Sequence, residues 1–223
     1  MNLKKHWWKA LTIILLIYTI IAGLMSGVPA KPILNETIRN LYFHVPMWFG
    51  MVFILSVSVV YSIKYLRKPT IYNDVMAFES AKVGILYGVL GILTGMVWAN
   101  FTWGDWWVND AKLNGAAIGL LVYFAYLVLR SSFAEQQQRA RISAVYNVFA
   151  FAALIPLLFI LPRLTDTLHP GAGGNPAFSA YDLDNRMRLV FYPAVAAWIL
   201  LGIWIFTVKS RLELLRQRLY EQN

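Results

Sequence analysis

Long apolar stretches alternate with short charged segments along this chain. A helix needs about 20 mostly apolar residues to cross the hydrocarbon core of a bilayer. Six stretches meet this requirement, at residues 8–27, 45–65, 81–99, 113–131, 143–162 and 188–208. Pro156 and Pro193 fall inside the last two, where neighbouring groups can satisfy the carbonyl that a proline frees. The pattern predicts an all-α membrane protein with six transmembrane helices in a single integral-membrane domain, residues 1–223.

The composition agrees with a membrane protein. Of the 223 residues, 59% are hydrophobic and 14% are charged, whereas soluble domains carry about 25% charged residues. The first stretch is too long for the apolar region of a signal peptide, and no clear cleavage site of small residues follows it. The chain contains no cysteine, which excludes disulfides, thiolate metal sites and iron–sulfur clusters.

The positive charges are distributed unequally between the two sides of the predicted membrane. Fourteen of the 20 lysine and arginine residues fall on the side that holds both termini. The other six are Lys31, Arg39, Lys112, Arg163, Arg186 and Arg188. The positive-inside rule places the richer side in the cytoplasm, so the net charge of +9 reflects topology and not a nucleic-acid partner. We expect both termini in the cytoplasm, outer loops at about 28–44, 100–112 and 163–187, and a short basic amphipathic helix from Lys209 at the cytoplasmic surface.

The second outer loop is rich in tryptophan. It reads Trp103-Gly104-Asp105-Trp106-Trp107-Val108-Asn109-Asp110. If the segment is helical, Trp103, Trp106, Trp107 and Asp110 share one face, because they stand at i, i+3, i+4 and i+7. Tryptophan is also common at membrane interfaces, but scattered anchors do not explain this density. We favour a flat aromatic platform for a large planar apolar ligand over a simple interfacial belt.

Two of the three histidines fall on the outer side. His44 stands at the start of the second stretch and His169 in the third outer loop, whereas His6 lies among lysines in the N-terminal tail. Neutral imidazole is a ligand for iron, copper and zinc. Two imidazoles on separate loops beside an aromatic platform fit haem with bis-histidine ligation. Zinc fits less well, because it takes three or four protein ligands. Either histidine taken alone is interpreted more simply as a solvated loop residue.

Charged side chains complete the predicted outer face. Asp110 is a candidate N-cap for the fourth helix, and Asp182 and Asp184 are candidate caps for the helix that leads into the sixth stretch. Arg39 and Lys112 stand near the outer ends of stretches. They are candidates to neutralise two haem propionates, although pairing with lipid phosphate or neighbouring acids is the simpler interpretation.

The residues around the tryptophans and histidines resemble a known family. The run from Trp103 to Leu113 is similar to the WWD signature of haem-handling proteins of cytochrome c biogenesis. Tyr42-Phe43-His44-Val45-Pro46 resembles the segment around the first outer histidine of that family, and Thr167-Leu168-His169-Pro170 the segment around its second. The six-span form without an extra domain looks most like the CcmC type, and the resemblance covers nearly the whole chain.

Two positions depart from the family pattern. Asn109 stands where the family usually has a tryptophan, and Lys112 where it usually has an arginine. The first change removes one indole, and the second replaces a planar fork of donors by a point charge. Neither change removes a candidate axial ligand.

The resemblance implies a role in haem handling without enzymatic catalysis. CcmC-like proteins hold haem at the outer face of the bacterial inner membrane and promote its loading onto a periplasmic haem chaperone. They work beside an ABC-type complex of an ATP-binding subunit, a second membrane subunit and a small membrane protein. This chain lacks a glycine loop that would cradle phosphate, so ATP hydrolysis falls to a partner. The residues expected around haem b are His44 and His169 as axial ligands, with Trp103, Trp106, Trp107, Asp110, Lys112 and Arg39.

Two other classes of membrane protein stay open on the sequence alone. A quinone-linked b-type cytochrome carries its haem ligands inside spans, and no predicted span contains histidine. A permease that exports haem or another solute usually has polar residues at mid-membrane, and these spans show few, mostly Ser56, Ser58, Thr94 and Asn147. A Soret band that is lost on changing either outer histidine favours haem handling. Substrate flux in proteoliposomes with this chain alone favours the permease.

Overall fold

The computed structural model describes residues 3–30, 34–169 and 183–221. Within these ranges all regular secondary structure is helical. Six helices are long and apolar enough to cross a membrane, which confirms the predicted all-α class and number of spans. The elements are α1 (Leu3–Met25), η1 (Asn35–Asn40), α2 (Leu41–Arg67), α3 (Ile71–Trp103), α4 (Ala111–Ser131), α5 (Gln136–Ile155), η2 (Pro156–Ile160), α6 (Leu161–Leu164) and α7 (Asn185–Glu221).

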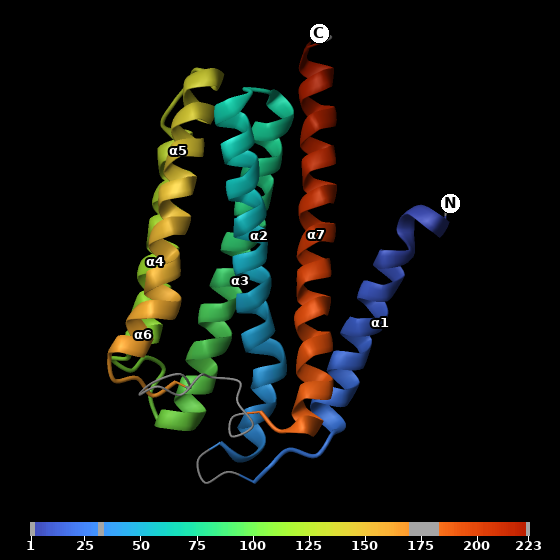
Figure 1. Cartoon of the computed structure of the whole chain (residues 1–223), viewed down its shortest axis with the longest axis vertical. Helices are drawn as coiled ribbons and strands as arrows, with labels where there is room; N and C mark the ends of the chain where they lie inside the picture. The colour runs from blue at the N-terminus through green and yellow to red at the C-terminus, as the bar shows by residue number, and fades with distance from the viewer. Residues whose placement is uncertain (1–2, 31–33, 170–182, 222–223) are drawn as a thin grey trace.

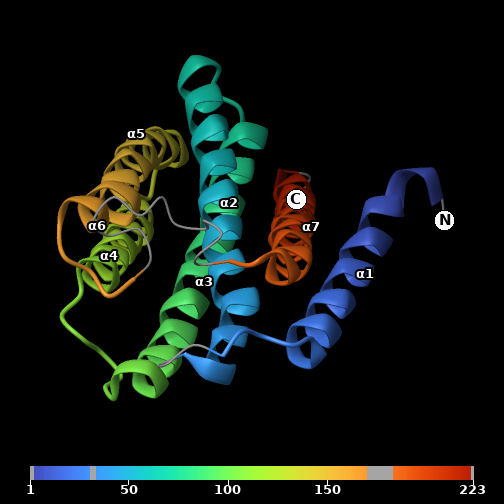
Figure 2. The same cartoon turned by 60° about the horizontal axis from the view of Figure 1, so that its bottom comes forward.

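The α2–α3 hairpin lies at the centre of the bundle. Helix α2 packs against α3, α5 and α7, and α4 packs against α5. Figure 1 shows the α4–α5 pair on one side of the hairpin and α7 on the other. Helix α1 is outermost: it packs mainly against α7, and its N-terminal end leans away from the bundle (Figures 1 and 2). Most of the α1 surface is therefore in position to face lipid.

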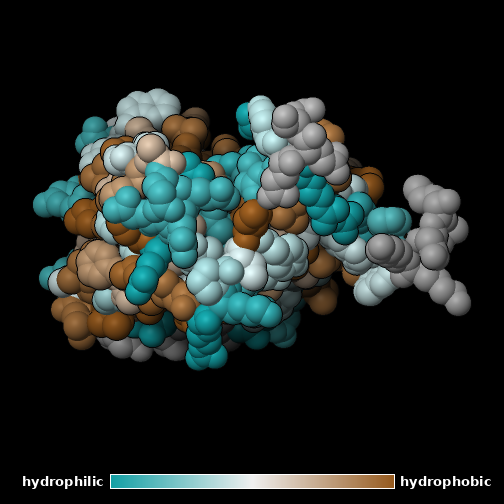
Figure 3. Space-filling model, turned by 90° about the horizontal axis from the view of Figure 1, so that it is seen from above, coloured by the Kyte–Doolittle hydropathy of each residue, from teal (hydrophilic) through white to brown (hydrophobic). Residues whose placement is uncertain are grey.

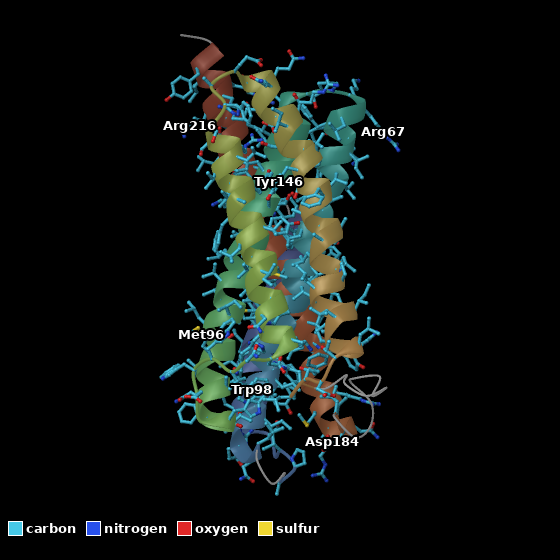
Figure 4. The ribbon with its side chains drawn as sticks, turned by 90° about the vertical axis from the view of Figure 1, so that its left-hand side faces the viewer. Arg67, Met96, Trp98, Tyr146, Asp184 and Arg216 are labelled. Carbon is cyan, nitrogen blue, oxygen red and sulfur yellow. The ribbon has the colours of Figure 1, made fainter. Side chains whose placement is uncertain are left out.

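The two ends of the bundle differ in what they carry. One end, which we call the basic end, holds the α2–α3 and α4–α5 turns and the C-terminus of α7; Arg67 and Arg216 mark it in Figure 4. Figure 3 looks onto this end and shows hydrophilic residues gathered there. The other, the histidine end, holds η1, the α3–α4 turn and the start of α7; Trp98 and Asp184 mark it in Figure 4.

Several helices extend beyond the predicted apolar stretches. Helix α2 begins at Leu41, so His44 lies in the first turn of a helix and not in the expected loop at 28–44. Helix α3 continues to Trp103, and the tail from Lys209 is the unbroken end of α7, not a separate surface helix. A hydropathy window detects the part of a helix that crosses hydrocarbon, whereas backbone hydrogen bonds carry the helix on into the polar region.

The fifth span changes its helical geometry at a proline. Helix α5 ends at Ile155, and Pro156–Ile160 form a π-helical turn before α6. Proline lacks the backbone N–H and crowds the preceding turn, and a single π-turn is one way for a helix to accommodate this. The carbonyl oxygen of Leu157 lies against Gly115 of α4, where an added Cβ would stand 2.4 Å from that oxygen. Glycine at position 115 thus allows α4 to pack directly on the backbone of the π-turn.

Buried polar groups connect the helices near the basic end. Arg130 of α4 donates to both carboxylate oxygens of Asp74 on α3, each over 2.7 Å. The amide of Asn147 on α5 donates to the hydroxyls of Ser58 and Ser62 on α2. Such hydrogen bonds hold membrane helices together where lipid is as apolar as the side chains. Ser58 and Asn147, two of the few polar residues inside the spans, therefore serve helix packing.

Candidate functional site

The tryptophan segment is a turn between two helices. Helix α3 ends at Trp103, and Gly104 follows with a φ of 87°, a left-handed conformation that favours glycine. Residues 104–107 form bends, and α4 begins only after Asp110. The expectation that Trp103, Trp106, Trp107 and Asp110 share one helical face is therefore wrong. The glycine ends one helix and the aspartate starts the next, so the helical register is broken between them.

The three tryptophans have different surroundings. Trp103 lies edge-on to the imidazole of His169, with ring centroids 5.2 Å apart. Trp106 and Trp107 are 55% and 40% exposed, and the indole N–H of Trp107 donates to Asn114 of α4. The turn thus presents two indoles at the surface beside a third that contacts a candidate iron ligand.

Asp110 joins the start of α4 to the segment that carries His169. Its Oδ1 accepts hydrogen bonds from two backbone N–H groups in the first turn of α4, which confirms the predicted N-cap. Its Oδ2 accepts from the hydroxyl of Thr167 over 2.6 Å and from the N–H of Leu168 over 2.8 Å. Nδ1 of His169 lies 3.0 Å from Oδ1. One buried carboxylate therefore caps a helix and fastens the loop that follows α6.

These contacts set the charge of Asp110 and the tautomer of His169. Burial alone would raise the pKa of the Asp110 carboxyl, but hydrogen bonds from His169, Thr167 and Leu168 outweigh burial and hold the pKa well below its usual range. A carboxylate only accepts hydrogen bonds, so Nδ1 of His169 carries the proton. The lone pair of this imidazole then lies on Nε2, as in carboxylate–histidine–metal arrangements.

His44 is buried between α2 and α3, with 9% of its surface exposed. Its Nδ1 lies 2.9 Å from the hydroxyl of Thr94, whose own proton is directed to the carbonyl groups of Leu90 and Gly91. Thr94 therefore accepts from Nδ1–H, and the lone pair of His44 lies on Nε2. That lone pair accepts the indole N–H of Trp48, with 3.3 Å between the nitrogens.

Sequence reasoning missed the side chains that surround His44. Trp48 follows it by one helical turn, and Thr94 and Trp98 stand one turn apart on α3. The Trp98 ring lies edge-on to the imidazole of His44, with ring centroids 5.8 Å apart. A Cβ added at Gly95 would stand 2.9 Å from Cε1 of His44. The i, i+4 spacing of His44 and Trp48 was visible in the sequence, whereas the partners on α3 become apparent only when α2 and α3 pack.

The two candidate propionate partners lie in different settings. Lys112 lies in the first turn of α4, and its backbone N–H donates to the carboxylate of Asp110 over 2.9 Å. Arg39 belongs to η1, where it pairs with Glu36 and donates to backbone carbonyl groups at the end of α1. Arg39 therefore fastens η1 to α1, and its contact with a propionate stays a prediction.

Two further sequence predictions concern the loops at this end. Asn109, which stands at a position where the family usually has tryptophan, accepts a hydrogen bond from Asn114 over 2.7 Å and so ties the turn to α4. Asp184 accepts from the N–H of Met187 over 2.8 Å, which confirms it as the cap of α7. The predicted cap Asp182 lies outside the described residues.

The donor set at the histidine end suits a metal that brings its own equatorial ligands. His44 and His169 both lie at the histidine end, and each imidazole has its lone pair on Nε2. Among the described residues, no group of three or more histidine, aspartate or glutamate side chains could hold a metal ion. Two imidazoles with neighbouring indoles fit haem iron, whose other four ligands come from the porphyrin.

Fold and site together define a class: a multi-pass helical membrane protein with two imidazoles and an indole-rich turn at one end. The profile of the family described as "CcmC: Heme exporter protein C" matches residues 2–223, so the chain belongs to this family of cytochrome c biogenesis. The resemblance drawn from the sequence is thereby confirmed. The family serves transport and biogenesis and is not enzymatic, as expected.

Two heme exporter proteins C match the chain over most of their length. The chain is 28% identical to heme exporter protein C of Haemophilus influenzae over 214 residues, which cover 93% of this chain and 83% of that protein. It is 27% identical to heme exporter protein C of Bradyrhizobium diazoefficiens over 218 residues, 95% of this chain and 79% of that protein. A shorter match of 99 residues is 40% identical to cytochrome c biogenesis protein CcsA of Prochlorococcus marinus and covers 42% of this chain and 32% of that protein.

Proposed function

We propose that this protein binds haem b at the outer face of the bacterial inner membrane and presents it to a periplasmic haem chaperone during cytochrome c maturation. In this proposal the whole chain acts as one membrane domain with both termini in the cytoplasm. His44 and His169 supply the axial ligands, and Trp103, Trp106 and Trp107 pack around the porphyrin. Lys112 and Arg39 are the proposed partners of the propionates.

One observation carries the proposal: the hydrogen bonds hold both imidazoles in the same tautomer. Thr94 accepts from Nδ1 of His44 and Asp110 from Nδ1 of His169, so Nε2 is the basic nitrogen in each ring. A protein partner on the second nitrogen is the usual companion of a metal-binding histidine. The two partners come from separate parts of the fold, Thr94 from α3 and Asp110 from the N-cap of α4, and they leave the same nitrogen free of a proton in both rings.

The proposal requires a local rearrangement at His44. Its Nε2 lone pair accepts the indole N–H of Trp48, and one lone pair cannot serve an indole and an iron ion at the same time. Haem binding therefore displaces Trp48 from His44. The hydrogen bond between Trp48 and His44 re-forms when haem leaves. It therefore lowers the net affinity of His44 for haem iron, which suits a protein that transfers haem to a partner.

The proposed partners are those that the family implies. Its sequence has no glycine loop that would bind the phosphates of ATP. In the proposal, an ABC-type complex with an ATP-binding subunit, a second membrane subunit and a small membrane protein supplies that activity. The histidine end then faces the periplasm, where the chaperone takes up the haem.

Replacement of single histidines tests the proposal. We expect His44→Ala and His169→Ala each to abolish stable haem retention, because one remaining imidazole cannot form the low-spin bis-histidine complex. The measurement is the Soret band of protein purified in detergent after addition of haem, together with loading of the chaperone. His6→Ala, at the opposite end of α1, is the matched control and should retain haem as wild type does.

Two results would contradict this assignment. Low-spin haem with normal chaperone loading in either outer histidine variant would exclude bis-histidine ligation. Flux of haem across proteoliposomes that contain only this chain would instead identify a permease.

A further inference from the structure

A line of exposed apolar residues runs along the C-terminal part of α7. Val208, Leu212, Leu215 and Leu219 follow one another at intervals of four, three and four residues, and they are 48%, 67%, 57% and 62% exposed. This spacing is that of the d and a positions of a heptad. We propose that this face, the leucine seam, docks an acidic amphipathic helix of another polypeptide.

Most of the seam extends beyond the hydrocarbon core. Arg188 and Lys209 bound an uncharged part of α7 of about 20 residues, or ~30 Å of helix, which matches the thickness of that core. Helix α7 continues past Lys209 without a break, and its end rises above the neighbouring helices in Figure 1. At about 1.5 Å per residue, Leu215 and Leu219 stand ~9 and ~15 Å beyond Lys209, past a headgroup layer of roughly 5–8 Å.

The seam points away from the rest of the bundle. Ser210, on the opposite side of the helix, is 1% exposed. Glu213 and Gln217 lie on the same inner side, are half-buried, and share a hydrogen bond over 3.1 Å. A helix whose inner face is covered and whose last two seam leucines lie past the headgroup layer exposes the kind of contiguous apolar patch that marks an interaction site.

The charges beside the seam indicate the kind of partner. In the heptad that the seam defines, Lys209 and Arg216 occupy e positions, and Arg211 and Arg218 occupy g positions. All four are exposed. Lys209 lies 4.0 Å from Glu79 and Arg216 lies 4.0 Å from Glu213, both long distances for an ion pair, so both flanks of the seam keep exposed positive charge. Side chains at e and g lie beside those of the partner helix and determine which helices pair. Glutamate or aspartate at the facing positions would be attracted.

The same charges argue against pairing of two identical chains. In a homodimer through the seam, the e and g positions of one copy would face the e or g positions of the other, and each position holds lysine or arginine. Like charges at these positions destabilise a coiled coil. The occupant that the seam fits is therefore a different, acidic helix.

The test uses the full chain in nanodiscs of phosphatidylcholine, which carry no net charge. The probe is a synthetic three-heptad peptide with leucine at a and d and glutamate at e and g; the matched peptide has lysine at e and g. We expect the acidic peptide to bind at least about ten-fold more tightly than the basic one, in line with electrostatic selection at these positions. Combined Arg211→Glu, Arg216→Glu and Arg218→Glu should reverse the preference.

A matched pair of variants separates the seam from an exposed leucine elsewhere. Leu212→Gln with Leu215→Gln should weaken binding of the acidic peptide at least about ten-fold, because the two leucines that the bound peptide would bury are lost. Leu66→Gln changes a leucine that is 40% exposed near the end of α2, outside the seam, and should bind as wild type does. Equal binding of both peptides, no binding by wild type, or undiminished binding by the leucine variant would each overturn the proposal.

Two further outcomes identify other occupants and would also overturn it. The chain has no cysteine, so Leu215→Cys provides a single thiol. Efficient disulfide formation between two copies at this thiol would assign the seam to self-association. A nitroxide attached to the same cysteine reports the surroundings of the seam in nanodiscs that contain phosphatidylglycerol. If oxygen reaches the nitroxide and a water-soluble nickel chelate does not, the seam lies in lipid. Haem retention should be unchanged in the seam variants, because the seam lies at the basic end.

Discussion

Asp110 connects the start of α4 to the loop that carries His169. Asp110 is 3% exposed, and its oxygens accept from the first turn of α4, from Thr167, from Leu168 and from His169. The sequence predicts Asp110 among the haem-binding residues. The geometry supports the view that it acts through His169, as a positioning residue.

Replacement of Asp110 by asparagine should weaken haem binding by roughly 10–100-fold, the usual effect of losing a hydrogen-bond partner of a metal-binding histidine. The amide oxygen can still cap α4, but the negative charge opposite His169 is lost. Haem titration of the purified protein measures the affinity, and the low-spin electron paramagnetic resonance spectrum reports the axial imidazole. Asp105→Asn, in the same turn, is the control. Wild-type affinity with an unchanged spectrum in the Asp110 variant would exclude a positioning role.

The exposed indoles allow a second prediction. An aromatic contact contributes about 0.5–1.5 kcal/mol beyond its buried area, so replacing Trp106 and Trp107 together by alanine should weaken haem transfer several-fold or more at normal abundance. Phenylalanine at both positions should preserve much of the activity, because a planar apolar surface stays. Trp7→Ala, a residue 63% exposed on α1, is the control. Full chaperone loading by the double alanine variant would show that these indoles only anchor the turn in the interface.

Two glycines of α4 control how closely this helix packs against the fifth span. A Cβ at Gly115 would stand 2.4 Å from the backbone oxygen of Leu157, whereas a Cβ at Gly119 would stand 2.5 Å from a methyl group of Leu154. A leucine methyl group can rotate away, but a carbonyl in the π-turn can move only with the backbone. The π-turn leads into α6 and the loop that carries His169, so packing at Gly115 also affects the site.

Gly115→Ala should therefore destabilise the protein by about 1–3 kcal/mol, the usual cost of overpacking, and should lower haem affinity by moving His169. Gly119→Ala should cost less and should leave haem affinity unchanged. Thermal unfolding in detergent and haem titration of the two variants measure these effects. If the two substitutions are equally tolerated, the contact between α4 and the π-turn does not position the loop.

The complete bundle carries two different candidate sites at its two ends. The histidine end carries both imidazoles and the tryptophan turn, and the basic end carries the buried Asp74–Arg130 pair and the leucine seam. The described structure places these ends on opposite sides of the bundle (Figure 4). The distribution of basic residues predicts that the basic end faces the cytoplasm.

Reporter fusions test this orientation. Fusions after Lys31, Lys112 and Asp182 should report a periplasmic location, and fusions after Arg67 and Ser132 a cytoplasmic one, because 14 of the 20 basic side chains lie on the latter side. Alkaline phosphatase activity and green fluorescent protein fluorescence provide opposite readouts for the two sides. A cytoplasmic location of the fusion at Lys112 would place the histidine end inside and would contradict presentation of haem to a periplasmic chaperone.

Several properties of this protein could be predicted from the sequence alone. The number of spans, the N-cap role of Asp110 and the family follow from runs of neighbouring residues, because apolar length, capping and short motifs are local properties of a chain. The predicted ends of the helices differ from the observed ones, since α2 and α3 continue past the apolar part that a hydropathy window detects.

Tertiary structure decided what each histidine can do. Thr94 stands 50 residues from His44, and Asp110 stands 59 residues from His169. No local pattern connects these pairs, because they meet only when α3 packs on α2 and the loop after α6 folds back on α4. The break at Gly104 likewise separated tryptophans that a regular helix would have aligned. The sequence alone determined that two imidazoles and three indoles belong to one side of a membrane protein; packing determined which nitrogen of each imidazole is basic.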